Sequence, residues 1–232
     1  TPLRPENPIT YMTQKGLVDR NNNPKDAFYV FKSYWNDTNP FAYIESHTWD
    51  ERQGPKGLKR SVSVYSNCSE VELFLNGKSV GVKKRNTKEF PAAGLNWDVD
   101  FKDGKNTLLA LGKTKTGDIV KDELNVNYRF VKNGKAKSLT LEYNQLKNGN
   151  YIVTATALDK NGLRALDFEE RVYFQCLSGG ETQKAMGTPT GSEVIEMANG
   201  KASIEVVRTS KNIPLKMMVL SQDFKGTYLT IK

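Results

Sequence analysis

The sequence predicts an all-β protein built from two successive β-sandwich domains, with one short helix near its start. Two observations support this prediction. From residue 41 onward, short segments alternate apolar and polar residues at intervals of about ten residues, and Gly- and Asn-containing turns separate them. The chain has 232 residues, which is enough for two domains of about 100 residues each.

The helix is predicted over residues 24–35. Asn23 can cap its N-terminus, Pro24 suits the first helical position, and the charge of Asp26 complements the helix dipole. An apolar stripe at helical spacing follows, formed by Ala27, Phe28, Phe31, Tyr34 and Trp35. Such an aromatic face needs a packing partner, and residues 1–22, rich in Pro and Asn, offer little.

Seven strands are predicted in the first series, at residues 41–49, 58–67, 71–75, 78–84, 96–101, 106–113 and 122–130. In the fifth of them, Trp97, Val99 and Phe101 alternate with two aspartates. Between the third and fourth strands, the Asn76-Gly77 pair of VELFLNGKSVG suits a two-residue type I′ turn. We therefore expect this segment to be the bend of a hairpin and not a ligand-binding tip.

A polar, Gly-containing stretch at residues 132–137 is the predicted linker between the domains. Strands are predicted beyond it at residues 138–144, 151–159, 170–177, 202–209, 215–222 and 226–232. Residues 178–199 are rich in Gly and Pro and suggest loops between short strands. No helix is expected after Trp35.

Composition and charge exclude several classes. Hydrophobic residues make up 38% of the chain and charged residues 26%, as in soluble globular proteins, and no apolar run approaches the ~18 residues of a membrane span. The net charge of +8 could attract phosphates. The basic residues are scattered, however, so we favour a solvated surface over nucleic-acid binding.

Catalytic and metal-binding motifs are missing from the sequence. His47 is the only histidine, and no GxSxG elbow surrounds a serine. Two carboxylate pairs, Asp98 with Asp100 and Glu169 with Glu170, could in principle serve acid–base chemistry, but the first pair falls on the solvent side of its strand. We expect no catalytic residue, no metal site and no cofactor.

The two cysteines, Cys68 and Cys176, fall in different predicted domains, which favours two unpaired thiols. Trp49 and Phe74 could stack on sugar rings if they are exposed. Packing in a core or against another domain is the favoured interpretation for both aromatic residues.

Several long motifs in the first 130 residues resemble the junction between the catalytic barrel of a glycoside hydrolase family 2 enzyme and its C-terminal sandwiches. The motifs are TPLRPENP, QKGLVDRNNNPKDAFYVFKSYW, SHTW, VYSNCSEVELFLNGKSVG and NWDVDFKDGKNTLLALG. Residues 138–232 are similar, less sharply, to the additional immunoglobulin-like or invasin-like domain of such enzymes, with VTATALDKNG as the best match.

This resemblance implies a domain organisation. Residues 1–36 would be the last loop and helix of a (β/α)8 barrel, residues 37–131 a family 2 sandwich, and residues 138–232 a second, immunoglobulin-like sandwich. The aromatic face of the helix would then pack on a barrel that precedes this segment. The start at Thr1, without an initiator Met or leader, agrees with a segment of a longer chain.

The resemblance also implies a function: non-catalytic accessory domains of a bacterial, β-galactosidase-like enzyme that hydrolyses terminal β-glycosides. The catalytic glutamates would lie on the preceding barrel, and His47 and Trp49 would approach the rim of its cleft. The expected partners are that barrel, carbohydrate and further copies of the enzyme, with the periplasm or the exterior as the compartment. The alternatives are an independent carbohydrate-binding module, which binds through exposed aromatic residues, and an adhesin-like pair of repeats.

Overall fold

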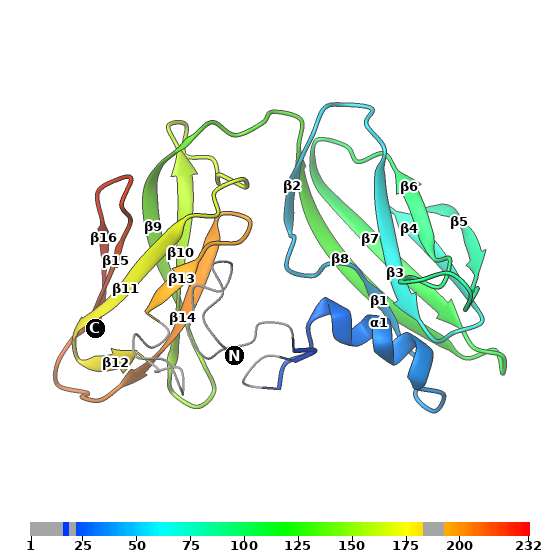
Figure 1. The fold of residues 1–232 in the computed structure, drawn as a ribbon, viewed down its shortest axis with the longest axis horizontal. Coiled ribbons are helices and arrows are strands. Elements are labelled where there is room, and N and C mark those ends of the chain that lie inside the picture. Colours follow the sequence, from blue (N-terminus) through cyan, green and yellow to red (C-terminus); the bar gives the residue numbers. More distant parts are fainter. Residues whose placement is uncertain (1–15, 19–21, 183–192) are drawn as a thin grey trace, which may run out of the picture. The chain divides into compact units, whose positions relative to one another are not determined.

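The computed structural model describes residues 16–18, 22–182 and 193–232. The motif TPLRPENP and most of QKGLVDR lie outside the described residues. Within the described residues the chain contains one helix and sixteen strands in four sheets (Figure 1), which confirms the prediction of a mostly β protein. The described residues fall into two compact units, which we call the first unit (up to Lys132) and the second unit (from Asn133).

The first unit contains a three-stranded and a five-stranded sheet. The smaller sheet has the order β1-β3-β6 and is antiparallel, with strands β1 (Ala42–Ile44), β3 (Arg60–Ser66) and β6 (Asn96–Val99). The larger sheet has the order β2-β8-β7-β4-β5, with strands β2 (Glu51–Gln53), β8 (Ile119–Arg129), β7 (Gly104–Lys113), β4 (Glu70–Leu75) and β5 (Lys78–Lys84). Its pairings are antiparallel except for β2 with β8, which is parallel.

The main hydrophobic core of the first unit is built by both sheets. Val62, Val64 and Trp97 from the smaller sheet meet Leu73 and Val126 from the larger one, and all five side chains are buried. Burial of alternate residues is what the period-two patterns predict for strands with one face on a core. The alternation of residues 97–101 is therefore confirmed, since both aspartates between the buried residues are exposed.

The hairpin of β4 and β5 has the predicted two-residue turn. Asn76 and Gly77 have φ values of 51° and 78°, as a type I′ turn requires. The Asn76 side chain donates to Asn106 Oδ1 and accepts from the Thr107 amide, both at 3.0 Å. The turn is thus tied to strand β7, which confirms its role as a bend.

Helix α1 (Asp26–Trp35) begins two residues later than predicted. Pro24 forms a β-bridge with Val18, and the Lys25 amide donates to the Leu17 carbonyl at 3.0 Å. Residues 24 and 25 are therefore held in extended backbone, and Lys25 is the N-cap residue, without a side-chain cap. The prediction that Asn23 caps a helix starting at Pro24 was wrong, because this bridge competes for the backbone of the segment.

The packed side of α1 also differs from the predicted stripe. Val30 and Ser33 are buried, and Val30 contacts a small cluster with Tyr65 of β3 and Ala92. In Figure 1 the helix lies beside β1 and β3. Of the predicted stripe, Phe31 is half-buried and Trp35 is 73% exposed, so part of the aromatic face remains uncovered by the first unit.

The second unit contains two four-stranded antiparallel sheets. One has the order β12-β14-β10-β9, with strands β12 (Gly180–Thr182), β14 (Lys201–Arg208), β10 (Tyr151–Asp159) and β9 (Ala136–Gln145). The other has the order β13-β11-β15-β16, with strands β13 (Val194–Glu196), β11 (Arg171–Ser178), β15 (Leu215–Leu220) and β16 (Thr227–Ile231). Val153 and Ile204 of the first sheet share a core with Phe174 and Met217 of the second.

Two short strands depart from the predicted pattern. The first predicted strand of nine residues is reduced to β1. Residues 50–57, which separate the first two predicted strands, contain β2.

Both cysteines are free thiols, as the sequence predicted. Burial raises the pKa of Cys176, whose Sγ lies 3.0 Å from the Gly180 carbonyl oxygen of β12.

Candidate functional site

The loop after β1 carries both residues that the sequence singled out, His47 and Trp49. His47 stacks on Tyr43 of β1, with ring centroids 4.8 Å apart and an interplanar angle of 19°. Tyr43 stacks in turn on Tyr29 of α1, at 3.7 Å and 5°. The three rings form a continuous stack that links the helix, the strand and the loop.

Three carboxylates lie around this aromatic stack and the Tyr65 ring beside it. Asp26 of α1 accepts a hydrogen bond from the Tyr43 hydroxyl at 2.6 Å. Asp122 of β8 accepts from His47 Nε2 at 2.8 Å and from the Ile44 amide at 2.7 Å. The Glu45 carboxylate lies near the Tyr65 hydroxyl and contributes to its raised pKa. Asp26 and Asp122 thus fix aromatic rings of the stack, and they position the helix and the loop.

Burial and the neighbouring acids change the ionisation of both tyrosine hydroxyls. Burial is the larger cause for Tyr43, and its hydrogen bond to Asp26 adds to it; both raise the pKa of Tyr43. Burial also raises the pKa of Tyr65, and the Glu45 charge adds to the effect. Both hydroxyls are therefore held in the neutral form that donates to the carboxylates.

A test of this cluster uses alkaline pH. Tyrosines of an unfolded chain ionise near pH 10, whereas folded Tyr43 and Tyr65 keep their protons above that pH. The stabilisation from these raised pKa values is complete below about pH 10 and is lost as the pH rises through the folded values. We expect the double variant Tyr43→Phe/Tyr65→Phe to lose less stability than the parent between pH 8 and pH 11, measured by urea unfolding. Equal losses would contradict the neutral, donating hydroxyls.

Trp49 is exposed, while its backbone is fixed. Its side chain is 56% exposed. Its amide donates to the Ser46 carbonyl at 3.1 Å, and its own carbonyl accepts from Arg52 Nε at 3.2 Å. Arg52 also donates to the Glu45 carbonyl at 3.3 Å, and burial lowers the pKa of Arg52. An indole on a fixed loop with one open face can contact a ligand or another domain. Phe74, the other sugar-stacking candidate, is half-buried.

The outward side of α1 forms a second aromatic surface. Phe31 and Trp35 are one helical turn apart, and their ring centroids lie 4.9 Å from each other. Tyr34 packs against Phe90, which is 70% exposed, at 5.8 Å. The Tyr34 hydroxyl also donates to the Glu89 carbonyl. Exposed apolar surface of this kind on a fixed helix is typical of a contact surface.

The first unit also contains an open pocket of about 910 Å³ near the C-terminal end of α1. Its lining includes Asn67, Arg85 and Lys115 together with several hydroxyl side chains. Asn67 donates to the Asn36 and Asn39 carbonyls at 2.7 and 3.0 Å and so fixes the chain that leaves the helix. The Asn67 side chain thus has a structural role in this pocket.

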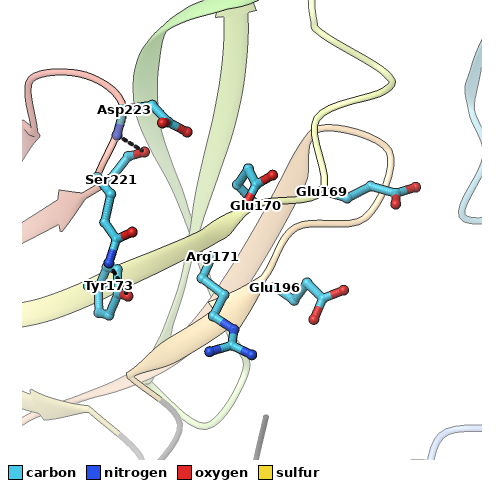
Figure 2. Close-up of a pocket in the computed structure, with 8 residues that line it drawn as sticks. Glu169, Glu170, Arg171, Tyr173, Glu196, Ser221 and Asp223 are labelled. Atoms are coloured by element: carbon cyan, nitrogen blue, oxygen red, sulfur yellow. Dashed lines mark hydrogen bonds between the residues drawn. The ribbon is translucent and has the colours of Figure 1, made fainter. Parts of the chain in front are cut away.

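A second pocket, of about 600 Å³, lies in the second unit (Figure 2). Its lining residues come from the start of β11, the end of β13 and the loop after β15: Glu169, Glu170, Arg171, Tyr173, Glu196, Ser221, Gln222 and Asp223. We call this site the β11 pocket. The sequence revealed only the adjacent pair Glu169 and Glu170. Arg171 and Tyr173 follow the pair directly, whereas the other lining residues lie 26 to 54 residues later. These distant residues meet the pair through strand pairing, for which the sequence carries no local signal.

The described residues contain no group of three or more His, Cys, Asp or Glu side chains arranged to hold a metal ion. In the same residues, no helix is long and apolar enough to span a membrane. Asp98 and Asp100 lie on an exposed strand face, whereas Glu169 and Glu170 line the β11 pocket. His47 and Trp49 lie two residues apart on one loop. The His47 ring stacks on Tyr43, whereas the Trp49 indole is exposed.

Comparison with known sequences matches residues 57–121 to a domain of unknown function (DUF4982). A predicted β-glucuronidase of Formosa agariphila is 74% identical over 232 residues, which is 100% of this chain and 28% of that protein. A β-galactosidase of Bacteroides ovatus, BoGH2A, is 33% identical over 95 residues, which is 41% of this chain and 10% of that enzyme. The chain therefore spans less than a third of the length of these relatives.

Solved structures of glycosidases are also similar to this chain. A β-glucuronidase of Parabacteroides merdae matches with a TM-score of 0.88 and 36% identity, covering 100% of this chain and 29% of that one. A glycosyl hydrolase family 2 member from Bacteroides cellulosilyticus shares the fold, with a TM-score of 0.54, 21% identity and coverage of 95% of this chain and 32% of that one. The chain belongs to glycoside hydrolase family 2, as the C-terminal region of one of its enzymes.

Proposed function

We propose that this chain is the accessory C-terminal region of a family 2 glycosidase that hydrolyses β-glucuronides, and that it supplies no catalytic carboxylate itself. The observation that carries this proposal is the similarity of the whole chain, at 74% and 36% identity, to proteins named as β-glucuronidases. The reaction would be retaining hydrolysis by two carboxylates about 5 Å apart, on the part of the enzyme that precedes this region.

A glucuronide is favoured over the galactoside that the sequence motifs first suggested. The β-galactosidase relative matches 41% of the chain at 33% identity, far less than the β-glucuronidase relative. The net charge of +8 also suits an anionic substrate, because a positive field raises the local concentration of anions. We therefore revise the proposed substrate from β-galactosides to β-glucuronides.

The accessory role is supported by the arrangement of the first unit. The acids around the aromatic stack are engaged in hydrogen bonds that position α1 and the loop after β1. The outward aromatic surface of α1, with Phe31 and Trp35, suits a contact with the preceding catalytic barrel. In this interpretation α1 is the last helix of that barrel, residues 37–131 and 138–232 are two immunoglobulin-like sandwiches, and residues 132–137 link them.

His47 and Trp49 are proposed to lie at the rim of the catalytic cleft. The loop that carries them is anchored to α1 through the ring stack and to β8 through the bond of His47 to Asp122. Because α1 is proposed to contact the barrel, the same helix would hold the exposed indole of Trp49 near the barrel. Carbohydrate or aglycone groups at the cleft mouth could then stack on Trp49.

The test uses the full-length enzyme with aryl β-D-glucuronide and aryl β-D-galactoside substrates. We expect kcat/KM for the glucuronide to be at least about 100-fold higher, since a site built to bind a polar substrate group rejects analogues that lack it. Preference for the galactoside would contradict the proposed activity.

Trp49→Ala in the same enzyme should raise KM several-fold with kcat unchanged, the signature of lost ground-state binding. Tyr228→Ala serves as the control and should leave KM unchanged, because Tyr228 is an exposed aromatic residue of the second unit with no proposed contact. Unchanged kinetics of Trp49→Ala would refute the rim position.

A further inference from the structure

We propose that the β11 pocket of the second unit binds a short neutral oligosaccharide. This inference is independent of the proposed β-glucuronidase activity, because it concerns only the eight residues that line this pocket. The pocket volume of about 600 Å³ falls within the range of roughly 300–1,000 Å³ of small-molecule sites.

The pairing of β11 with β13 and β15 brings together pocket residues from three parts of the chain. Tyr173 of β11 lies opposite Val194 of β13 and Leu220 of β15, and Arg171 lies opposite Glu196. All of these residues face away from the core, because Val172 and Phe174 between them point inward. The Met197 amide donates to the Glu170 carbonyl at 3.2 Å, so two walls of the pocket are joined through the backbone.

An aromatic ring is available in the pocket. Tyr173 is half-buried, and its hydroxyl accepts a hydrogen bond from Gln222 Nε2 at 3.3 Å. Beside it on the sheet lies Leu220, which is 39% exposed. The C–H groups of a sugar ring stack on such a surface, since an aromatic face carries partial negative charge. Tyr173 therefore provides the aromatic surface for one pyranose ring, while Leu220, its neighbour on β15, lies outside the lining of the pocket.

Charged groups surround this aromatic surface, and their side chains are free to bind. In Figure 2, Ser221 and Asp223 lie on one side of the pocket, Glu169 and Glu196 on the other, and Glu170 and Arg171 between them. Within the described part of the chain, the side chains of the five charged residues make no hydrogen bond or ion pair. Hydroxyl groups of a sugar can donate to the carboxylates and accept from Arg171, with the added strength of charged partners.

The charge of the pocket selects among ligands. Four carboxylates and one guanidinium give it a net charge of −3, although the whole chain carries +8. A uronate would face like-charge repulsion there, whereas a neutral saccharide would not. The described residues also contain no arrangement that would hold a metal ion. The pocket therefore favours a neutral saccharide, which the proposed glucuronide substrate is not.

The experiment is calorimetric titration of the 232-residue chain with cellotetraose, β-1,4-galactotetraose and mannotetraose, with tetragalacturonate as the acidic probe. We expect at least one neutral tetrasaccharide to bind with Kd between about 0.05 and 1 mM. Tetragalacturonate should bind at least about ten-fold more weakly, a difference of about 1.4 kcal/mol. Tyr173→Ala and Gln222→Ala should each weaken neutral binding at least about five-fold.

Tyr143→Ala is the matched control, because Tyr143 is an exposed tyrosine on β9, in the other sheet of the same unit. Circular dichroism establishes that each variant is folded, and Gln222→Ala changes only an exposed loop side chain. No neutral binding below about 10 mM, tighter binding of the uronate, or loss of binding in Tyr143→Ala alone would overturn the proposal. Binding of tetralysine without binding of any saccharide would also overturn it and indicate a site for cationic peptides.

Discussion

Phe174→Ala is expected to lower the free energy of unfolding of the second unit by about 3–5 kcal/mol, the range for removing a buried phenylalanine ring. Phe174 is 2% exposed and lies in the core shared by both sheets of that unit, with Val153, Ile204 and Met217 as further members. Removing its ring leaves a cavity between the sheets, because the surrounding side chains can relax only partly into the vacated space. The effect would be large against the usual stability of a domain of this size.

The same substitution tests whether the two compact units are separate folding domains. If they are, urea unfolding will show the second-unit transition moving to lower urea while the first-unit transition stays in place. Leu73→Ala, at a fully buried position of the first core, should produce the opposite pattern at about 2–5 kcal/mol. Tyr228→Ala, at an exposed position of β16, should stay within about 0.5 kcal/mol of the parent. If Phe174→Ala shifts both units together, the proposed domain division is refuted.

The sequence allowed most strands to be predicted because each of them has one face on a core. In β10 every second residue from Tyr151 to Asp159 is buried, and the strand has the predicted bounds. The hairpin at Asn76-Gly77 was predictable for a different reason, since few residues other than Asn and Gly adopt two successive positive φ values. Both signals are local, so a single sequence is enough to reveal them.

Elements that depend on distant partners could not be predicted in this way. Strand β2 consists of Glu, Arg and Gln, without alternation, and it forms by parallel pairing with β8, more than 70 residues later. The start of α1 was misplaced because the bridge between Val18 and Pro24 leaves no mark in the helical pattern. Strand pairing and local propensity compete at such sites, and pairing prevails.

In the candidate sites, too, local features were predictable and contacts between distant residues were not. The motif SHTW pointed to His47 and Trp49 as candidate residues. It did not predict the stack of His47 on Tyr43 or the bond of His47 to Asp122, which lies 75 residues away. In the β11 pocket, Glu169 and Glu170 were recognisable from the sequence as a carboxylate pair, whereas Tyr173 was recognisable only as part of a strand. Sequence patterns reveal the residue types of a site, and the fold determines which of them meet.

Asp122→Ala is expected to destabilise the first unit by about 2–4 kcal/mol, because it removes the acceptor of two hydrogen bonds. One bond comes from the Ile44 amide at 2.7 Å, in the buried part of β1, and the other from His47 at 2.8 Å. Hydrogen bonds to charged groups contribute roughly 1.5–3 kcal/mol each, and a buried amide left without an acceptor adds its desolvation cost. Urea unfolding measures the loss, and Asp98→Ala, at an exposed aspartate of β6, should change stability by less than about 0.5 kcal/mol.

Asp122→Asn separates the two consequences of this substitution. The amide oxygen can still accept from Ile44, so the variant should recover more than half of the lost stability. In the full-length enzyme, Asp122→Ala should raise KM in the same direction as Trp49→Ala if the loop after β1 lies at the cleft rim, because His47 then loses the bond that fixes this loop. A destabilised variant with unchanged KM would show that the stack and its carboxylates serve only to hold α1 against the sheet. The cluster would then be a structural joint between helix and sandwich, with no part in substrate access.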